Sequence, residues 1–323
     1  MDAEQQRLAT QITSRPAFVV AYGNTGIGKS VANLYSFPRG IHIAGWGALK
    51  PSVSTVGYVP PAIVEVKPDE LMIGRLRDEV SRAKAKYKDA DAVVIDDLSV
   101  VITRTARGME SKYKDGRKLY GVLGGLLGAA VDEWASMGLH TVVDCHEKPP
   151  TYETEEGGPQ PRGTLIAEGG PALPGSMGPA IVKASTMAYH AVVDPMRRPW
   201  PLAFRAGPHE GHHLWLSKDR DNIIRGRGPA NLAEIMRKAG YKVSRPVGWE
   251  WHEECVEWAA QAILQGHPES AVLTEVAKKV MPANGKPGTG PFALRWIVRD
   301  TQSRVELRRA DPFGDIRSLG INF

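Results

Sequence analysis

Eight residues near the start of the chain have the types and spacing of a phosphate-binding loop. Gly23 to Ser30 read G-N-T-G-I-G-K-S and match the pattern G-x-x-x-x-G-K-S. In this pattern the glycines let backbone N–H groups face phosphate oxygens, the lysine reaches the β- and γ-phosphates, and the serine hydroxyl ligates magnesium. The sequence therefore predicts a site for ATP with Mg²⁺, formed by Gly23, Asn24, Thr25, Gly26, Ile27, Gly28, Lys29 and Ser30.

Two acidic residues follow a strongly apolar run and have the chemistry to act with this loop. The run A-V-V-I at 92–95 leads directly into Asp96 and Asp97. At the tip of a buried strand, the carboxylate of Asp96 is expected to hold the magnesium ion opposite Ser30. Asp97 would either orient the attacking water as a general base or cap the helix that follows. Glu65, on a candidate neighbouring strand, is a rival for the role of base.

Two further positions carry side chains that suit contact with a triphosphate. His146 follows a strand predicted at 140–144, where a polar side chain can sense the γ-phosphate or the attacking water; the alternative is a structural histidine. Lys218 and Arg220 lie two residues apart at the end of another predicted strand, so they point the same way. Such a pair can act as an arginine finger on a neighbouring subunit's nucleotide, and the alternative is two surface cations in a turn.

The elements that would position these residues alternate between strands and helices. Strands are predicted at 17–22, 40–44, 63–66, 92–95 and 140–144, with helices from 29 to Pro38, at 68–88 and at 119–137. This alternation predicts an α/β protein with a mostly parallel central sheet and helices on both faces. Short strands at 187–193, 202–206 and 213–217 would extend one edge, before a helix at 229–239.

Segments rich in Gly, Pro and Ser divide the chain further. Residues 45–61 are expected to form a loop, and 148–180 a long loop of the functional or mobile kind. A boundary at 244–248 precedes two helices, at 251–264 and 271–280, and then a Pro/Gly loop and a tail. The predicted division is an N-terminal tail at 1–14, a core at 15–244 and a small, mainly helical accessory domain at 245–323.

The bulk composition indicates an ordinary globular protein. The 323 residues carry a net charge of +5, with 42% hydrophobic and 24% charged residues. No apolar run approaches the roughly 18–20 residues that span a membrane, and residues 1–15 lack the apolar stretch of a signal peptide. We therefore expect a cytoplasmic protein without membrane contact, whose two cysteines, Cys145 and Cys255, are reduced.

A basic segment follows the acidic strand. Residues 102–120 hold six cationic and two acidic side chains, with Tyr113 and Tyr120 between them. Cations and aromatic rings together suit a single-stranded nucleic acid, because phosphates bind the cations and bases stack on the rings. The alternative is a charged loop that is merely solvated.

In this order the features resemble RecA/RadA-like P-loop ATPases, most closely the phage nucleotide-binding proteins that include Sak-type single-strand annealing ATPases. The resemblance covers about residues 15–240 and rests on the phosphate-binding loop and the motifs A-V-V-I-D-D-L-S, V-V-D-C-H, P-A-L-P-G and S-K-D-R. It implies a RecA-like core, ATP and Mg²⁺ as ligands, a homo-oligomeric ring or filament, and a finger role for Lys218 and Arg220. The segment 40–44 ends without the glutamate that many such proteins carry, which leaves the base open between Glu65 and Asp97.

These features favour an ATPase acting in DNA recombination, single-strand annealing or replication, phage-encoded and located in the host cytoplasm. One alternative is an NTPase subunit of a phage assembly or packaging machine that acts on a protein partner. A packaging motor would normally carry a nuclease domain with clustered carboxylates, which residues 245–323 lack. A small-molecule P-loop kinase is a further alternative, which the K-D-R at 218–220 fits less well.

Overall fold

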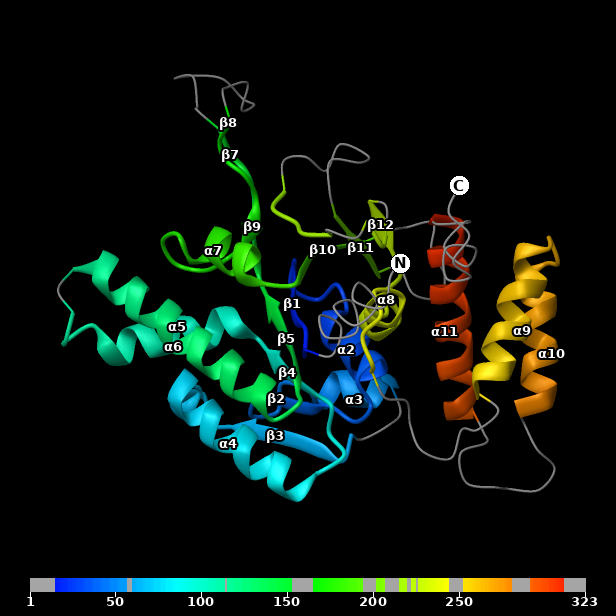
Figure 1. Cartoon of the computed structure of the whole chain (residues 1–323), viewed down its shortest axis with the longest axis horizontal. Helices are drawn as coiled ribbons and strands as arrows, with labels where there is room; N and C mark the ends of the chain where they lie inside the picture. Colours follow the sequence, from blue (N-terminus) through cyan, green and yellow to red (C-terminus); the bar gives the residue numbers. More distant parts are fainter. Residues whose placement is uncertain are drawn as a thin grey trace, which may run out of the picture.

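A computed structural model describes residues 15–56, 60–113, 115–152, 165–193, 202–206, 215–219, 222–224, 226–243, 252–280 and 291–310. A mostly parallel β-sheet lies at its centre (Figure 1). Within these residues the sheet has eight strands in the order β12-β11-β10-β1-β5-β4-β2-β3. Neighbouring strands from β3 to β10 run parallel, while β11 and β12 are antiparallel additions at one edge. The strands are β1 Phe18–Gly23, β2 Ile41–Gly45, β3 Ala62–Val66, β4 Ala92–Asp96, β5 His140–Cys145, β10 Met187–Val193, β11 Leu202–Arg205 and β12 Arg227–Gly228.

Helices cover both faces of the sheet, and alternate side chains of the central strands β1, β4 and β5 pack in different apolar clusters. Val20 of β1 packs in a cluster with α4, α5, α6 and α7, whereas its neighbour Val19 packs in a second cluster with α2 and α8. Strands buried on both faces are near-continuous apolar runs, which explains the A-V-V-I of β4. The helices are α2 Lys29–Ser36, α3 Lys50–Val56, α4 Ile73–Lys86, α5 Leu98–Met109, α6 Gly116–Ser136, α7 Met177–Ala184, α8 Leu232–Lys238, α9 His252–Leu264, α10 Glu269–Val280 and α11 Pro291–Ala310.

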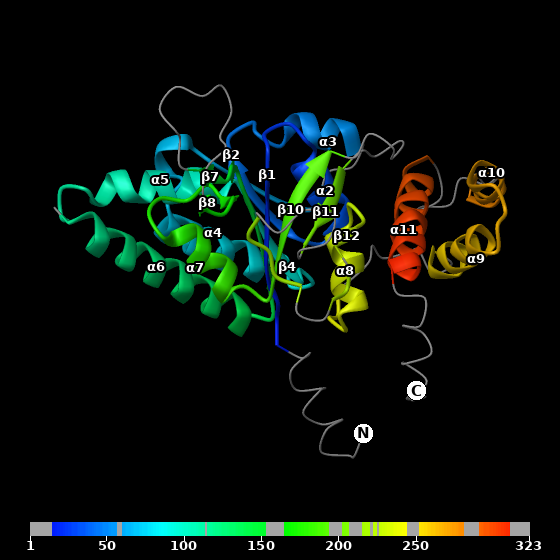
Figure 2. The same ribbon diagram turned by 90° about the horizontal axis from the view of Figure 1, so that it is seen from above.

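The three C-terminal helices pack on the core through α2, the helix that follows the phosphate-binding loop. Both views place α11 between the core helix α8 and the pair α9–α10 (Figure 1, Figure 2). Leu34 and Tyr35 of α2 share an apolar cluster with Val256 of α9, Val276 of α10 and Val305 of α11. One side of the loop's helix therefore contacts the sheet and the other contacts the C-terminal helices.

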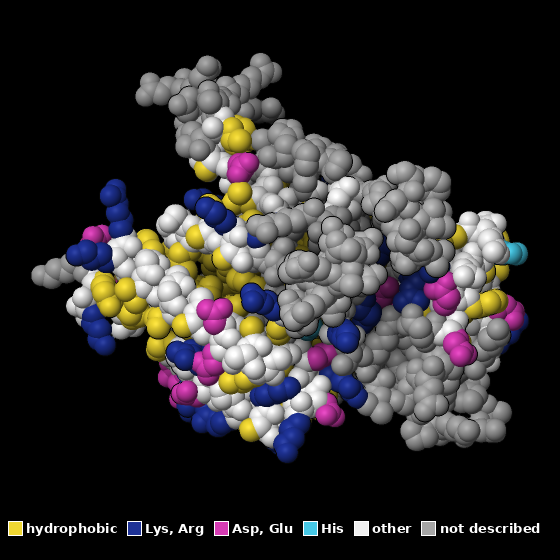
Figure 3. Space-filling model, viewed as in Figure 1, with side chains coloured by type: hydrophobic (Ala, Val, Ile, Leu, Met, Phe, Trp, Pro, Cys, Tyr) yellow, Lys and Arg dark blue, Asp and Glu magenta, His cyan; other side chains and the backbone are white. Residues whose placement is uncertain are grey.

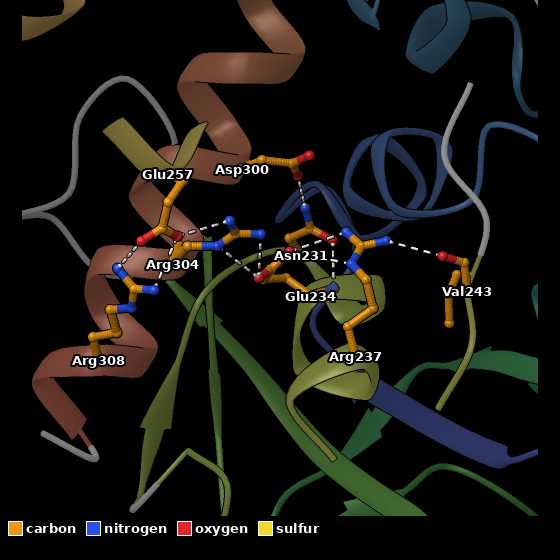
Figure 4. Close-up of polar contacts among 8 residues, drawn as sticks. All are labelled: Asn231, Glu234, Arg237, Val243, Glu257, Asp300, Arg304 and Arg308. Carbon is orange, nitrogen blue, oxygen red and sulfur yellow. Dashed lines mark hydrogen bonds and ion pairs between the residues drawn. The ribbon is translucent and has the colours of Figure 1, made fainter. Parts of the chain in front are cut away.

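Charged side chains also join α11 to its neighbours (Figure 4). Arg304 lies 3.3 Å from both Glu234 of α8 and Glu257 of α9, and Arg308 donates two hydrogen bonds of 2.9 Å to Glu257. Burial raises the pKa of Glu257, but the hydrogen bonds and charges of Arg308 and Arg304 outweigh burial, so its pKa lies below the ordinary value. These contacts orient α11 between the core and α9.

Several predicted loops contain regular structure. The segment 45–61 includes α3, whose Pro51 is tolerated because it occupies the first turn. The basic segment 102–120 is a helical hairpin of α5 and α6 rather than a loop, and it projects from the sheet in both views (Figure 1, Figure 2). The long loop at 148–180 contains the helix α7 and the short strands β6 Glu147–Lys148, β7 Thr151–Tyr152, β8 Leu165–Ala167 and β9 Gly170–Pro171; residues 153–164 lie outside the described part.

Two other predictions needed correction. The helix predicted at 68–88 begins as a 3-10 turn at Pro68–Glu70 and restarts as α4 at Ile73. The predicted C-terminal tail contains the long helix α11, which the pattern missed because contacts on several sides bury its polar residues Asp300, Thr301 and Ser303. Cys145 and Cys255 do not form a disulfide, as predicted. The predicted α/β fold, with a mostly parallel central sheet flanked by helices and a helical C-terminal part, is confirmed.

Candidate functional site

The phosphate-binding loop joins the carboxyl end of β1 to the first turn of α2. Gly28 has a φ of 98°, in the left-handed region where a side chain is strained, and it immediately precedes the helix. Gly23 is required for a different reason, since a Cβ there would lie 2.5 Å from the carbonyl oxygen of Ala191 in β10. Lys29 donates hydrogen bonds of 2.9 Å to the carbonyl oxygens of Gly23 and Asn24. The loop thus lies between a strand and the positive end of a helix, the context that the motif requires.

Asp96 ends β4 and lines the same pocket as Ser30. The pocket wall also includes Asn33, His42 and Val94. Magnesium prefers oxygen ligands and usually takes only one or two from protein side chains, keeping water as the rest. The hydroxyl of Ser30 and the carboxylate of Asp96 supply such a pair. These two oxygen donors are therefore of the kind that Mg²⁺ takes from a protein.

His146 connects the loop to Asp97. Its Nε2 lies 2.7 Å from Oδ2 of Asp97, and its Nδ1 lies 3.2 Å from the hydroxyl of Thr25 in the loop. The backbone N–H of His146 donates to the hydroxyl of Ser99 at 3.1 Å, which fixes the start of the segment after β5. The three side chains Thr25, His146 and Asp97 therefore form a continuous polar chain from the phosphate-binding loop to the strand that carries Asp96.

Asp97 has two side-chain contacts, and each bears on one of its two predicted roles, helix cap and general base. Its Oδ1 accepts the N–H of Ser99 at 2.6 Å, so it caps α5, while Oδ2 contacts His146. Burial raises the pKa of Asp97 above its ordinary value, and the neighbouring charge of His146 and the Ser99 hydrogen bond oppose that rise. A carboxyl group with a raised pKa is a better proton acceptor than an ordinary aspartate.

Glu65 lies at the same level of the sheet but further along it. Ala44 of β2 pairs with Glu65 on one side and with Asp96 on the other, so β2 separates the two acids. The side chain of Glu65 is exposed and accepts the N–H of Gly47 at 3.0 Å. Its contacts therefore belong to the turn after β2, whereas those of Asp97 lead to the loop.

The first two residues of the K-D-R motif, Lys218 and Asp219, lie on a segment that pairs with β10. Lys218 exchanges backbone hydrogen bonds with Ala188 of β10, and its ammonium donates to the carbonyl oxygens of Lys183 and Ser185 at the end of α7. Asp219 accepts the N–H groups of Ile223 and Ile224, each at 3.0 Å, and so orders the turn. Arg220 lies outside the described residues, so the finger role remains a prediction.

Sequence reasoning missed two buried residues, Asn33 in α2 and Asp144 in β5. Asp144 of β5 is fully buried, and its Oδ2 accepts a hydrogen bond of 2.8 Å from the side-chain amide of Asn33 in α2. Burial, followed by the charge of Asp96, raises the pKa of Asp144 well above its ordinary value. A buried acid inside the apolar run T-V-V-D-C was the available signal, since unpaired acids are rarely found there.

The comparisons with known proteins add a distant structural likeness. No protein-family model and no curated protein matches the chain. One solved structure that resembles it is a KaiC-like protein from the hyperthermophilic archaeon Pyrococcus horikoshii, with a TM-score of 0.35 and 13% sequence identity. The match covers 59% of this chain and 78% of that chain.

Proposed function

We propose that the protein is a magnesium-dependent ATPase that acts on DNA in recombination, single-strand annealing or replication. The observation that carries the ATPase proposal is the polar chain Thr25–His146–Asp97, which begins in the phosphate-binding loop and ends beside Asp96. A loop that only bound nucleotide would need no such chain. A hydrolase needs a base near the γ-phosphate and a group that responds to its removal.

Each residue of the candidate site has a role in this proposal. Lys29 and the N–H groups of Gly23 to Ser30 bind and orient the phosphates. Ser30 and Asp96 would hold Mg²⁺, which would neutralise charge on the phosphates when bound. Asp97 accepts the proton of the attacking water, and its raised pKa suits that task. His146 orients Asp97 and links it to Thr25, so loss of the γ-phosphate changes the contacts of the segment that follows β5.

A second copy of the chain would complete the site. Trp46 follows β2 at the carboxyl edge of the sheet and is 70% exposed, an unusual environment for a large aromatic side chain. A neighbouring subunit seated on this edge would cover Trp46 and bring its own Arg220 towards the nucleotide. The expected assembly is a ring or filament with ATP between subunits.

The α5–α6 hairpin is the proposed contact for single-stranded DNA. Lys and Arg side chains gather with apolar ones around its projecting end (Figure 3). Arg107, Lys112, Arg117 and Lys118 are exposed there. Arg104 is half-buried, and its guanidinium donates to the carbonyl oxygen of Pro68, so it supports the hairpin. The four exposed cations are placed to contact phosphates.

The direct test combines hydrolysis with mass. ATP turnover is measured with and without single-stranded DNA, and the mass of the protein is measured with and without nucleotide. The proposal expects DNA to stimulate turnover and nucleotide to favour a hexamer or filament. A monomer whose turnover ignores DNA but responds to a protein partner, or that phosphorylates a small acceptor, would contradict the DNA role. Arg220→Ala should bind ATP but hydrolyse it poorly, and unchanged turnover would remove the finger role.

A further inference from the structure

Two buried oxygen atoms beneath the phosphate-binding loop have no hydrogen-bond partner among the described residues. They are Oδ1 of Asp144 and Oδ1 of Asn33, in side chains that are 0% and 2% exposed. The same two side chains bond to each other through their remaining polar atoms. Buried polar atoms are nearly always paired with protein or ordered water, so two unpaired acceptors in one contact point to a group that donates hydrogen bonds there.

The pair lies against the proposed magnesium site. Ile95 of β4 pairs with Val143 of β5, so the next residues, Asp96 and Asp144, are neighbours on one face of the sheet. Adjacent strands are about 4.8 Å apart, which places the two carboxyl groups side by side. Asn33 is one helical turn beyond Ser30 on α2 and lines the same pocket as Ser30 and Asp96. Asn33 therefore belongs to the pocket wall, and Asp144 contacts it from β5.

A role only in holding α2 against β5 does not explain the unpaired oxygens of Asn33 and Asp144. The single bond from Asn33 to Asp144 already joins the two elements, and leucine-sized apolar side chains would join them without unpaired oxygens. Water is the donor that suits two acceptors beside a cation pocket, because magnesium retains several water ligands whose hydrogens point outward.

We infer that Asp144 and Asn33 are positioning residues of the magnesium site, whose unpaired oxygens accept hydrogen bonds from cation-bound water and hold Asp96 in place. The inference rests on the proposed function, since it assumes Mg²⁺ at Ser30 and Asp96. Neither residue touches the nucleotide in this account. Outer partners of metal ligands typically change metal affinity about 10–100-fold when they are replaced.

The experiment measures cation binding apart from turnover in the full-length chain. ATP affinity is measured by calorimetry in EDTA, and Mg²⁺ is then titrated at saturating ATP. The variants are Asp144→Leu, Asp144→Asn and Asn33→Leu. The matched control is Val142→Ala, which alters a fully buried side chain two residues earlier on the same strand and face. Thermal unfolding reports the stability of every variant.

The inference predicts that the substitutions change the Mg²⁺ midpoint but not the affinity for ATP in EDTA. Asp144→Leu and Asn33→Leu should bind ATP in EDTA within about twofold of the wild type but need about 10-fold or more Mg²⁺ for half-saturation. Asp144→Asn, which keeps one oxygen, should fall between, and it supplies the test if the leucine variants fail to fold. Val142→Ala should leave the Mg²⁺ midpoint unchanged.

Two results would overturn the inference. One is an unchanged Mg²⁺ midpoint in folded Asp144 and Asn33 variants, and the other is an equal shift in Val142→Ala, which would mean that packing alone matters. A wild-type chain that binds ATP but shows no response to Mg²⁺ would refute the magnesium site itself, and the inference with it. A wild-type chain that binds no ATP would refute the proposed function directly.

Discussion

Replacement of His146 by glutamine should shift the pH dependence of ATP hydrolysis. Glutamine keeps a polar side chain of similar length but removes the group that can become positively charged 2.7 Å from Asp97. Burial raises the pKa of Asp97, and the charge of His146 is the largest influence that opposes this rise. Without His146, the pKa of Asp97 should therefore rise further.

The size of the shift follows from the exposure of the pair. A close opposite charge lowers a carboxyl pKa by about 1–3 units. The side chain of His146 is 43% exposed, so solvent screens its charge and the low end of that range applies. A shift of about one unit corresponds to about 1.4 kcal/mol. Since the base must be ionised, the acid limb of kcat/KM should move to higher pH by about one unit.

The assay is steady-state ATP hydrolysis from about pH 5 to pH 9, a range that includes the ordinary pKa of histidine. The matched control is His267→Gln, because His267 is exposed in the turn between α9 and α10. This control should retain the wild-type profile. An acid limb that stays in place in His146→Gln, or that moves to lower pH, would refute the role of His146 in tuning Asp97.

Three further predictions concern the loop and its support. Gly28→Ala should reduce ATP affinity, since a φ of 98° costs a residue with a Cβ about 1–2 kcal/mol, and calorimetry should detect about a 10-fold loss. Trp134→Ala should lower the free energy of unfolding by about 3–5 kcal/mol in denaturant titrations, because the side chain of Trp134 in α6 is fully buried. The pKa of Glu257 is lowered, so its stabilising contacts are present above its ordinary value of 4.5 and lost as pH falls through its lower folded value. Hydrogen exchange should therefore show α11 loosening in acid, and Glu257→Gln should show little such change.

Local patterns predicted the parts of the site that depend on local geometry. The loop Gly23 to Ser30 and the strand ending at Asp96 follow from glycine positions and an unbroken apolar run. The contact between His146 and Asp97 could be predicted from the sequence, because the ends of adjacent parallel strands meet at one edge of a sheet. Which of Asp97 and Glu65 faces the loop depended on strand order, and β2 lies between Glu65 and Asp96.

Other features depend on contacts between distant segments. Asn33 and Asp144 are 111 residues apart, and neither is conspicuous without its partner. The helix α11 has no clear apolar stripe because its polar side chains, including Arg304, bond to helices on two sides. The charges of the basic segment at 102–120 predict a loop, but its ends are helical because buried residues such as Ile102 and Leu119 pack against the core. In these cases tertiary contacts decided the structure.

The central claim is that Gly23 to Ser30 bind ATP with magnesium, and calorimetry of ATP binding tests it most directly. Wild-type protein and Lys29→Ala are compared with Mg²⁺ present, and thermal unfolding confirms that both are folded. A charged hydrogen bond to phosphate contributes about 1.5–3 kcal/mol, so Lys29→Ala should bind ATP about 10–100-fold more weakly. Equal affinity in the two proteins, or a folded wild type that binds no ATP, would contradict the claim.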